Sequence, residues 1–485
     1  MKHPLRGAAA LATLLAAGLA PFALSSPASA APSGLAGDFN GDGYRDVAIA
    51  APAAKVSGKL WAGQVAVVYG TASGLNPAKH QVLSQNTAGV PGAAEADDEF
   101  GDQVAAADLN RDGYSDLVVG APREKVGSYP DAGTVVIVWG SKSGLSGGTT
   151  VKNPLSYAGS YFGMGLAAAD FTGDGKPDLA VSTQGRTGEA SWRIRLIRGP
   201  FAKSGSTGKA SEYAPGIDRP ALTAGRVDGD NRADLVATGS KANRDQLGSA
   251  VYYRGTASGI TKAATLRPAG TAAIGDLNKD GYGDIALGNP EDRAAEPSAS
   301  TGGRIDVVYG TSSGPSTTRR VALTQNSAGV PDSSETGDRF GQALAIGDYD
   351  KDGYGDLAVG APGESFGDAV DVRTWAGAVT LLRGSASGVT TARSVFLTQD
   401  SPGVPGATEM NDAFGHRLLA SDVNRDGRAD LTVVADGEND PEGAAWFLPG
   451  AASTLYSTTA STSFGPAKVG LPARTYTAFG YGLAG

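Results

Sequence analysis

The stretch Asp348-Tyr-Asp-Lys-Asp-Gly-Tyr-Gly-Asp356, followed directly by Leu357-Ala-Val-Gly-Ala-Pro362, decides how the rest of the chain is interpreted. Its acidic residues stand at loop positions 1, 3, 5 and 9. This spacing lets oxygens converge on one hard cation such as Ca²⁺, which takes about six to eight oxygen ligands. Gly353, at position 6, permits a sharp reversal because glycine enters positive φ without a steric penalty. The run after Asp356 predicts a short strand ended by a turn.

This nine-residue loop recurs along the chain. Its seven copies begin at Asp38, Asp108, Asp170, Arg226, Asp276, Asp348 and Asp422, at intervals of 70, 62, 56, 50, 72 and 74 residues. The intervals leave no room for an unrelated domain between copies. The sequence therefore predicts one repeat array over residues 31–485.

Each loop is embedded in the same succession of short segments. A small-sided segment such as Ala105-Ala-Ala107 precedes the loop, and an apolar segment follows it. An alternating third segment (133–139 in the second repeat) and a fourth (320–324 in the fifth) complete the unit. Four short antiparallel strands are the unit of a propeller blade, and about four to eight blades are usual. We predict an all-β fold, a seven-bladed β-propeller of four-stranded antiparallel blades with the small-sided strand innermost.

Two further motifs flank the loops. Phe-Gly precedes four of them by eight residues, and Gly-Ala-Pro follows at 120–122 and 360–362. The Phe-Gly pairs are Phe100-Gly101, Phe162-Gly163, Phe340-Gly341 and Phe414-Gly415. Together with the acidic loop they resemble the FG-GAP repeats of integrin alpha chains, and bacterial secreted members look most similar. The resemblance implies a seven-bladed propeller with calcium loops in the first hairpin of several blades. It implies little about the ligand, because such repeats occur in adhesion receptors, in lectins and as appendages of enzymes.

Closure of the ring is expected to involve the C-terminal segment. The first repeat lacks Phe-Gly before its loop, whereas the chain ends with Phe479-Gly-Tyr-Gly-Leu-Ala-Gly485. Gly-Leu-Ala-Gly also occurs at 34–37. We expect the C-terminal strand to join the first or the last blade, and the sequence does not distinguish the two.

Six of the seven loops are predicted to bind calcium, against the alternative of a solvated Asp-Gly turn. Side chains at positions 1, 3, 5 and 9 and the backbone carbonyl at position 7 would supply the oxygens. The predicted ligands are Asp38, Asn40, Asp42, Tyr44, Asp46, Asp108, Asn110, Asp112, Tyr114, Asp116, Asp170, Thr172, Asp174, Lys176, Asp178, Asp276, Asn278, Asp280, Tyr282, Asp284, Asp348, Asp350, Asp352, Tyr354, Asp356, Asp422, Asn424, Asp426, Arg428 and Asp430.

Two loops depart from the pattern. The third has Thr172 at position 3 and Pro177 at position 8, so its occupancy is left open. The fourth, residues 226–234, has Arg226 at position 1 and lacks the glycine at position 6. We predict that it holds no ion, and that the Arg226 guanidinium takes the place of the cation by pairing with Asp228 or Asp234.

The N-terminus and the composition bear on localisation and partners. Residues 1–30 have a basic head, an apolar core and a small-residue cleavage site, which predicts a cleaved signal peptide and a secreted protein. No second apolar stretch is long enough to span a bilayer. Removing Lys2 and Arg6 moves the formal charge from −9 to −11. This acidity argues against nucleic acid and anionic membranes as partners. The chain has no cysteine, so disulfides do not stabilise it.

Catalytic motifs are weak. Gly310-Thr-Ser-Ser-Gly314 matches the nucleophile elbow of hydrolases, but the same slot elsewhere has alanine in place of the serine, as in Gly70-Thr-Ala-Ser-Gly74. We interpret it as a turn. After processing, the histidines are His80 and His416, in different repeats, with no zinc-like spacing. No catalytic residue is predicted.

Two features remain as candidate partner contacts. A Glu-x-x-Asp-x-Phe-Gly connection recurs three times, with Glu95 and Asp98, Glu335 and Asp338, and Glu409 and Asp412. A shared ligand-binding use is open, but we interpret these side chains as caps of their own turns. The variable loops between second and third strands carry aromatic and charged residues, namely Trp61, Tyr129, Trp375, Arg123-Glu124-Lys125 and Glu364.

The sequence therefore predicts a secreted, calcium-binding propeller, expected to be monomeric, that binds an extracellular protein or glycan through the rim opposite the calcium loops. The alternative is a secreted carbohydrate-active enzyme, a polysaccharide lyase or hydrolase, whose acids would form one asymmetric cluster on that rim.

Overall fold

The computed structural model describes residues 33–153, 156–186, 192–241, 246–292, 299–367, 372–439, 442–472 and 477–485. The predicted signal peptide, residues 1–30, lies outside them. The described residues are strands and loops apart from one short 3-10 helix, η1 (Pro466–Val469). None of their helices is long and apolar enough to cross a bilayer.

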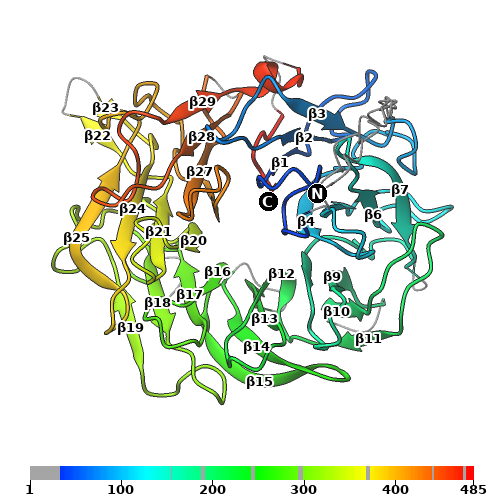
Figure 1. Cartoon of the computed structure of the whole chain (residues 1–485), viewed down its shortest axis with the longest axis horizontal. Coiled ribbons are helices and arrows are strands. Elements are labelled where there is room, and N and C mark those ends of the chain that lie inside the picture. Colours follow the sequence, from blue (N-terminus) through cyan, green and yellow to red (C-terminus); the bar gives the residue numbers. More distant parts are fainter. Residues whose placement is uncertain are drawn as a thin grey trace, which may run out of the picture. The chain divides into compact units, whose positions relative to one another are not determined.

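Seven four-stranded antiparallel sheets are arranged in a ring, which confirms the predicted seven-bladed β-propeller (Figure 1). From the inside of the ring outward, the strands are β30 (Leu483–Ala484), β1 (Val47–Ala51), β2 (Gln64–Val68) and β3 (His80–Leu83) in blade 1; β4 (Gln103–Ala107), β5 (Asp116–Ala121), β6 (Thr134–Trp139) and β7 (Ser146–Val151) in blade 2; β8 (Leu166–Ala169), β9 (Asp178–Gln184), β10 (Trp192–Ile197) and β11 (Ala210–Tyr213) in blade 3; and β12 (Asp218–Gly225), β13 (Asp234–Ser240), β14 (Ser249–Thr256) and β15 (Gly259–Pro268) in blade 4. The remaining blades are β16 (Thr271–Gly275), β17 (Asp284–Asn289), β18 (Arg304–Val308) and β19 (Arg320–Leu323) in blade 5; β20 (Ala343–Gly347), β21 (Asp356–Ala361), β24 (Ala378–Arg383) and β25 (Thr390–Leu397) in blade 6; and β26 (Arg417–Ser421), β27 (Asp430–Ala435), β28 (Ala444–Leu448) and β29 (Thr462–Phe464) in blade 7. A small hairpin, β22 (Phe366–Gly367) and β23 (Val372–Arg373), lies in the loop between β21 and β24.

The second strand of each blade is buried on both faces because it is packed between two neighbouring blades. In β5, Val119 joins the cluster that contains Val67 of blade 1, whereas Val118 joins the cluster that contains Leu179 of blade 3. Alternate side chains of one strand point to opposite sides of a sheet. The hydrophobic core is therefore divided into layers between the blades, and each blade depends on its neighbours.

The Phe-Gly and Gly-Ala-Pro motifs meet within blade 2 and at its contact with blade 3. Gly101 donates its backbone N–H to the Gly120 carbonyl at 2.9 Å, so the glycines of the two motifs pair directly. Gly120 also faces blade 3, where a Cβ on it would lie 2.4 Å from the backbone oxygen of Gly163. The glycine of Gly-Ala-Pro is thus required by the close approach of the next blade.

The C-terminal segment closes the ring in blade 1. Its strand β30 pairs with β1, with Ala484 opposite Ala48. Gly480 donates to the Ala50 carbonyl at 2.8 Å, the same bond that Gly101 makes in blade 2. Phe479 is fully buried. Residues 479–485 therefore supply the Phe-Gly and the inner strand that the first repeat lacks.

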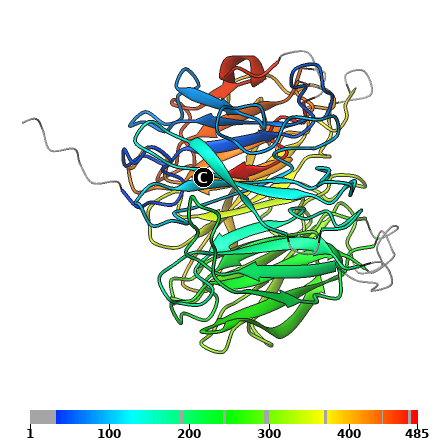
Figure 2. The ribbon, with the colours of Figure 1, turned by 90° about the vertical axis from the view of Figure 1, so that its right-hand side faces the viewer.

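The strands run across the thickness of the ring, so their connections gather on two faces (Figure 2). Each acidic loop joins an inner strand to a second strand, except in blade 1, where the inner strand comes from the C-terminal segment. We call the face with these loops the loop face. The loops between second and third strands and the connections between blades lie at the other end of the strands, and we call that end the junction face.

Candidate functional site

The acidic loops share one backbone arrangement. In the second loop, the position 1 carboxylate of Asp108 accepts from the N–H of Asp112 at 3.1 Å and of Gly113 at 2.9 Å. The other loops with aspartate at position 1 make the same bond to the glycine at position 6. Gly113 has φ +90°, and Asn231 of the fourth loop adopts φ +66° at the same place. The predicted reversal at position 6 is confirmed, and it forms in the fourth loop without glycine.

The position 9 aspartate is a buried clamp in all seven loops. Asp116 accepts from the N–H of Leu109, within its own loop, and from the N–H of Gly140, which follows the third strand, each at 2.9 Å. The equivalent aspartates of the other loops make the same pair of bonds at 2.9–3.1 Å, except that in the third loop Asp178 accepts from the N–H of Thr172, one residue later in the loop. Position 9 therefore fixes each loop to its own blade. The repeat pattern predicts the acid at position 9 but not its bond to the glycine after the third strand.

The loops are also joined to one another. In five loops, position 8 donates its N–H to the position 1 carbonyl of the preceding loop, as Ser115 does to Asp38 at 2.9 Å and Gly355 does to Asp276 at 2.8 Å. Pro177, at position 8 of the third loop, has no N–H to donate. Lysines add further links, because Lys351 Nζ donates to the Asp426 carbonyl of the next loop at 2.6 Å. Many of the neighbouring acidic loops are thus linked directly across the loop face.

Electrostatics of the loops favour a cation. Burial raises the pKa of Asp46 to about 8, and repulsion from Asp38 and Asp42 adds to the shift. Burial likewise raises the pKa of Asp356 to about 7. The ionised carboxylates are therefore destabilised, chiefly by burial and further by repulsion from the neighbouring acids. A divalent cation would relieve this repulsion, and carboxylates are the oxygen ligands that Ca²⁺ prefers.

The sixth loop brings its acids closest together. Carboxylate oxygens of Asp348, Asp350 and Asp356 lie within 4.8 Å of one another. Arg383, which ends β24, forms an ion pair with Asp350 from outside the loop. These residues offer the oxygen set expected of a calcium site.

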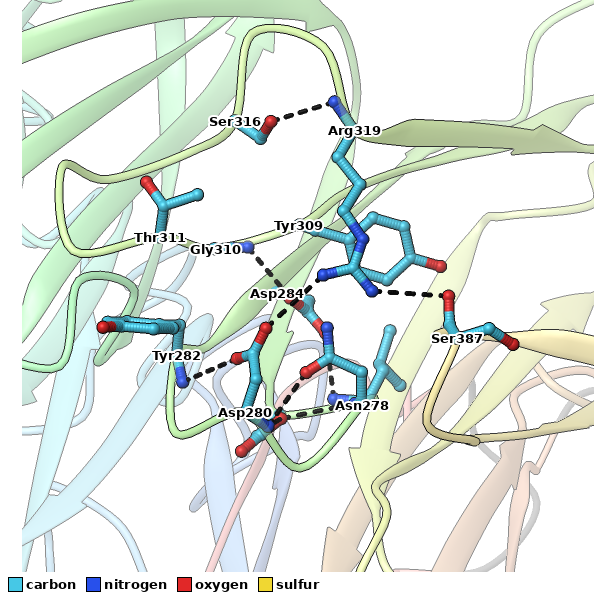
Figure 3. A network of polar contacts seen from close by, with 12 residues as sticks. Asn278, Asp280, Tyr282, Asp284, Tyr309, Gly310, Thr311, Ser316, Arg319 and Ser387 are labelled. Atoms are coloured by element: carbon cyan, nitrogen blue, oxygen red, sulfur yellow. Dashed lines mark hydrogen bonds and ion pairs between the residues drawn. The ribbon is translucent and has the colours of Figure 1, made fainter.

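The fifth loop shows how its acids are oriented (Figure 3). Asn278 Oδ1 accepts from the Asp280 N–H at 3.0 Å, and Asp280 Oδ1 accepts from the Tyr282 N–H at 3.0 Å. Arg319 lies 3.5 Å from Asp280 Oδ2, stacks over Tyr309 at 4.4 Å, and reaches the Ser387 carbonyl of the next blade at 3.4 Å. The position 5 carboxylate is therefore held at the loop surface by contacts from two blades.

The fourth loop corrects one prediction. In the described part of the chain, the ion-pair partner of Asp228 is Arg254, which also lies 4.0 Å from Asp230, rather than Arg226. Arg226 is exposed. The buried Asp228 carboxylate lies against β14, and Arg254 of that strand is the arginine within reach. Sequence proximity pointed to the wrong guanidinium.

Arg254 and Arg383 occupy the same place, directly before the glycine that follows the third strand. Each pairs with an aspartate at loop position 3, Asp228 or Asp350. The blades whose loops carry asparagine at position 3 have Tyr69, Trp139, Tyr309 and Pro449 at this place, and blade 3, with Thr172 at position 3, has Arg198. An acid at position 3 is thus accompanied by its own arginine.

On the junction face, the three aromatic residues predicted on the rim are solvent-exposed. Trp61 is 40% exposed, Tyr129 46% and Trp375 42%, and Arg339 stacks over Trp375 at 4.5 Å. Glu364, predicted with them as a surface contact, is only 2% exposed. That prediction is wrong, because the Glu364 side chain turns inward and accepts from Gln325 Nε2 at 2.6 Å.

The Glu-x-x-Asp connections are capped as interpreted. In each connection, the carboxylate of the second acid accepts from the backbone N–H of the first. Asp98 accepts from the Glu95 N–H at 2.6 Å, and Asp338 and Asp412 accept from Glu335 and Glu409 in the same way. Burial and the nearby Glu335 raise the pKa of Asp338 to about 7. Burial, with repulsion from Asp338, raises the pKa of Glu364 to about 9.

The remaining motifs are structural. In Gly310–Gly314, Thr311 and Gly314 exchange backbone bonds at 2.9 and 2.8 Å, which makes the segment a tight turn. His80 contacts the Pro77 carbonyl at 2.7 Å, and His416 contacts Asp436 at 3.0 Å in another blade.

Comparisons with known proteins agree with this geometry. The family model described as FG-GAP repeat matches residues 30–68, 100–138, 162–191, 269–308, 340–382 and 414–448. Blade 4, which has no Phe-Gly, falls between the third and fourth of these segments.

Curated relatives match part of the chain. Phosphatidylinositol-glycan-specific phospholipase D of Rattus norvegicus is 34% identical over 147 residues, 30% of this chain and 17% of that protein. Integrin alpha-IIb of Mus musculus is 36% identical over 167 residues, 33% of this chain and 15% of that protein. Integrin alpha-8 of Homo sapiens is 26% identical over 288 residues, 59% of this chain and 20% of that protein. The matched part of the chain thus spans a fifth or less of the length of these relatives.

Proposed function

We propose that this chain, which belongs to the FG-GAP repeat family and is homologous to integrin alpha chains, is a secreted, calcium-stabilised binding module that holds an extracellular protein or glycan on its junction face. The proposal has two parts. The loop face holds structural cations, and the junction face makes the partner contacts.

The distribution of exposed hydrophobic residues carries the second part. In the described chain, every exposed large hydrophobic side chain lies in a loop between second and third strands or in a connection between blades. These residues are Leu60, Trp61, Tyr129, Val372, Trp375, Met410 and Tyr481. Scattered exposed hydrophobics are ordinary, but gathering on one face marks an interaction surface. The loop face has none of this kind among the described residues.

The first part rests on the six loops with aspartate at position 1. Their side chains at positions 1, 3, 5 and 9 offer hard oxygen ligands, and the position 6 turn brings them together. Calcium loops of extracellular modules often have Kd values of about 10⁻⁴–10⁻³ M. At tenfold excess over Kd, each site stabilises the fold by about 1.4 kcal/mol.

The acids of the junction face support a binding module over an enzyme. An enzyme built on this scaffold would need one asymmetric cluster, whereas the buried acids recur in three blades at equivalent positions. Repetition favours a structural use of these carboxylates.

Secretion rests on residues 1–30, which we propose are a signal peptide. N-terminal sequencing of protein from the culture medium should begin near Ala31. A mature chain that retains Met1 and stays with the cells would contradict secretion. It would not bear on the proposed binding surface.

Binding is tested with a glycan array and a panel of immobilised extracellular-matrix glycoproteins, in calcium. We expect the wild-type protein to bind one class, and the Trp61→Ala/Trp375→Ala variant to lose at least tenfold in affinity. Tyr114→Ala, on the loop face, is the matched control and should bind as wild type. Binding that survives in the double variant, or release of new sugar ends from a polysaccharide panel, would contradict the proposal.

A further inference from the structure

We propose that the junction face carries a second class of calcium sites, separate from the acidic loops, at the contacts between blades 1 and 2, 5 and 6, and 6 and 7. Each site is formed by a buried glutamine, the two acids of the Glu-x-x-Asp connection and a glutamate that follows the second strand of the next blade. Nothing in this proposal depends on the identity of the partner.

The contact between blades 5 and 6 shows the geometry best. Carboxylate oxygens of Glu335, Asp338 and Glu364 lie within 4.8 Å of one another. Asp338 and Glu364 are each 2% exposed, whereas Glu335 is open to solvent. Two buried ligands and one exposed ligand form a cluster that an ion can enter from one side.

Gln325 supplies an independent indication of a ligand. The residue is 1% exposed, and its Nε2 donates to Glu364 at 2.6 Å, so the amide lies at the carboxylate cluster. Its Oε1 is buried and has no hydrogen-bond partner among the described residues. A buried acceptor without a partner is destabilising, and a cation bound at that oxygen would satisfy it.

The charge of the cluster is not balanced by a basic side chain. Among the described residues, no lysine, arginine or histidine forms an ion pair with Glu335, Asp338 or Glu364. Asp332 adds to the negative charge near Glu364. Buried charges in proteins are paired or coordinate metals. The donors are all carboxylate or amide oxygens, which favours Ca²⁺ over softer metals.

The same constellation recurs at two other contacts. Gln85 and Gln399 are 2% and 1% exposed, and each donates from Nε2 to the equivalent glutamate, Glu124 or Glu438. Their Oε1 atoms are also buried without a partner in the described chain. In all three copies the amide nitrogen contacts the glutamate and the amide oxygen is buried without a partner, and this shared arrangement indicates a common ligand.

The contact between blades 2 and 3 lacks the constellation. Counting eight residues from the position 9 aspartate leads to Glu124, Glu364 and Glu438 in the three blades, but to Arg186 in blade 3. Ser160 stands two residues before its phenylalanine, where the others have aspartate, and donates to the Ala132 carbonyl at 2.7 Å. Where the acids are missing, a positive side chain replaces the glutamate.

The first experiment counts calcium ions by native mass spectrometry of the full secreted chain. The variant Glu124→Gln/Glu364→Gln/Glu438→Gln keeps the side-chain shapes and removes three charges. We expect it to bind three fewer ions than the wild type. The matched control Glu212→Gln removes an acid of blade 3 that is paired with Arg195, and should leave the count unchanged. An equal count in the triple variant and the wild type would overturn the proposal.

A second measurement covers the case in which the triple variant does not fold. Wild-type crystals grown with Mn²⁺ are measured for anomalous scattering. We expect a peak within coordinating distance of Gln325 Oε1 and at the two equivalent clusters. Peaks in the acidic loops with none at these clusters would overturn the proposal without affecting the proposed loop sites. Carboxylates that share a proton or bind water would then explain the buried glutamine oxygens.

Discussion

The fourth and sixth acidic loops differ at one decisive position. Both bend at position 6, both are clamped by a buried position 9 aspartate, and both have an arginine paired with an acid at position 3. The sixth has Asp348 at position 1, whereas the fourth has Arg226. The loop conformation is therefore independent of position 1, and only the ability to gather carboxylates depends on it.

The difference separates two roles that the repeated motif combines. Position 9 and the position 6 turn build the hairpin and attach it to the third strand. Position 1 adds the charge that, in our proposal, lets the hairpin bind a cation. In the fourth loop, Arg254 supplies a fixed positive charge to Asp228, so that loop is complete without an ion.

Removing calcium should have the largest effect, and it should act through the six loops with aspartate at position 1. Chelation with EDTA removes up to about 8 kcal/mol if six sites each contribute about 1.4 kcal/mol. We expect a large fall in Tm by calorimetry in EDTA relative to millimolar calcium. A Tm that is unchanged by chelation would contradict cation binding by the six loops and hence their proposed difference from the fourth loop.

The position 9 clamp should matter in both loops. Asp234→Ala and Asp356→Ala each leave two buried N–H groups without an acceptor, at about 1–3 kcal/mol for each group. Urea unfolding should show a loss of about 2–6 kcal/mol in both variants. For Asp234→Ala the loss should be the same in calcium and in EDTA, and a loss seen only in calcium would contradict the clamp.

The two arginines should differ in their sensitivity to calcium. Arg254→Met leaves the buried Asp228 unpaired, and we expect a loss of about 2–3 kcal/mol, discounted because Arg254 is 38% exposed. Arg383→Met should cost less in calcium than in EDTA, because a bound ion takes over the charge of Asp350. Equal losses for Arg383→Met under both conditions would argue against an ion beside Asp350.

The smallest expected effect is a gain in calcium binding and in stability. The double variant Arg226→Asp/Asn231→Gly gives the fourth loop the acid and the glycine of the other loops. It is compared with the wild type, and both proteins keep Arg254. We expect one additional bound calcium by native mass spectrometry and about 1.4 kcal/mol of stabilisation at tenfold excess over Kd. An unchanged ion count would show that position 1 does not decide occupancy.

Much of the fold was predictable because the pattern recurs seven times and each copy lies within one stretch of sequence. The inner position of the small-sided strands and the four strands of each blade follow from patterns within single repeats. The sequence does not decide which blade β30 joins, because both end blades could accept a strand. In the structure β30 pairs with β1, and Gly37 packs so closely against Gly485 that a Cβ on it would come within 2.2 Å of the Gly485 backbone.

The candidate sites were less predictable where contacts join separate strands or separate blades. Arg254 and Gln325 lie far in sequence from Asp228 and Glu364, by 26 and 39 residues, and neither belongs to a known loop pattern. Glu364 was placed on the surface because its neighbours in sequence are loop residues. Such errors are expected wherever a side chain is positioned by the next strand or the next blade rather than by its own turn.

Anomalous diffraction from wild-type crystals grown in a calcium-free medium with Mn²⁺ compares the fourth and sixth loops in one map. We expect a peak between Asp348, Asp350 and Asp356, equivalent peaks in the other loops with aspartate at position 1, and none between Asp228, Asp230 and Asp234. A peak in the fourth loop, or an empty sixth loop beside an ordered Arg383, would contradict this expectation.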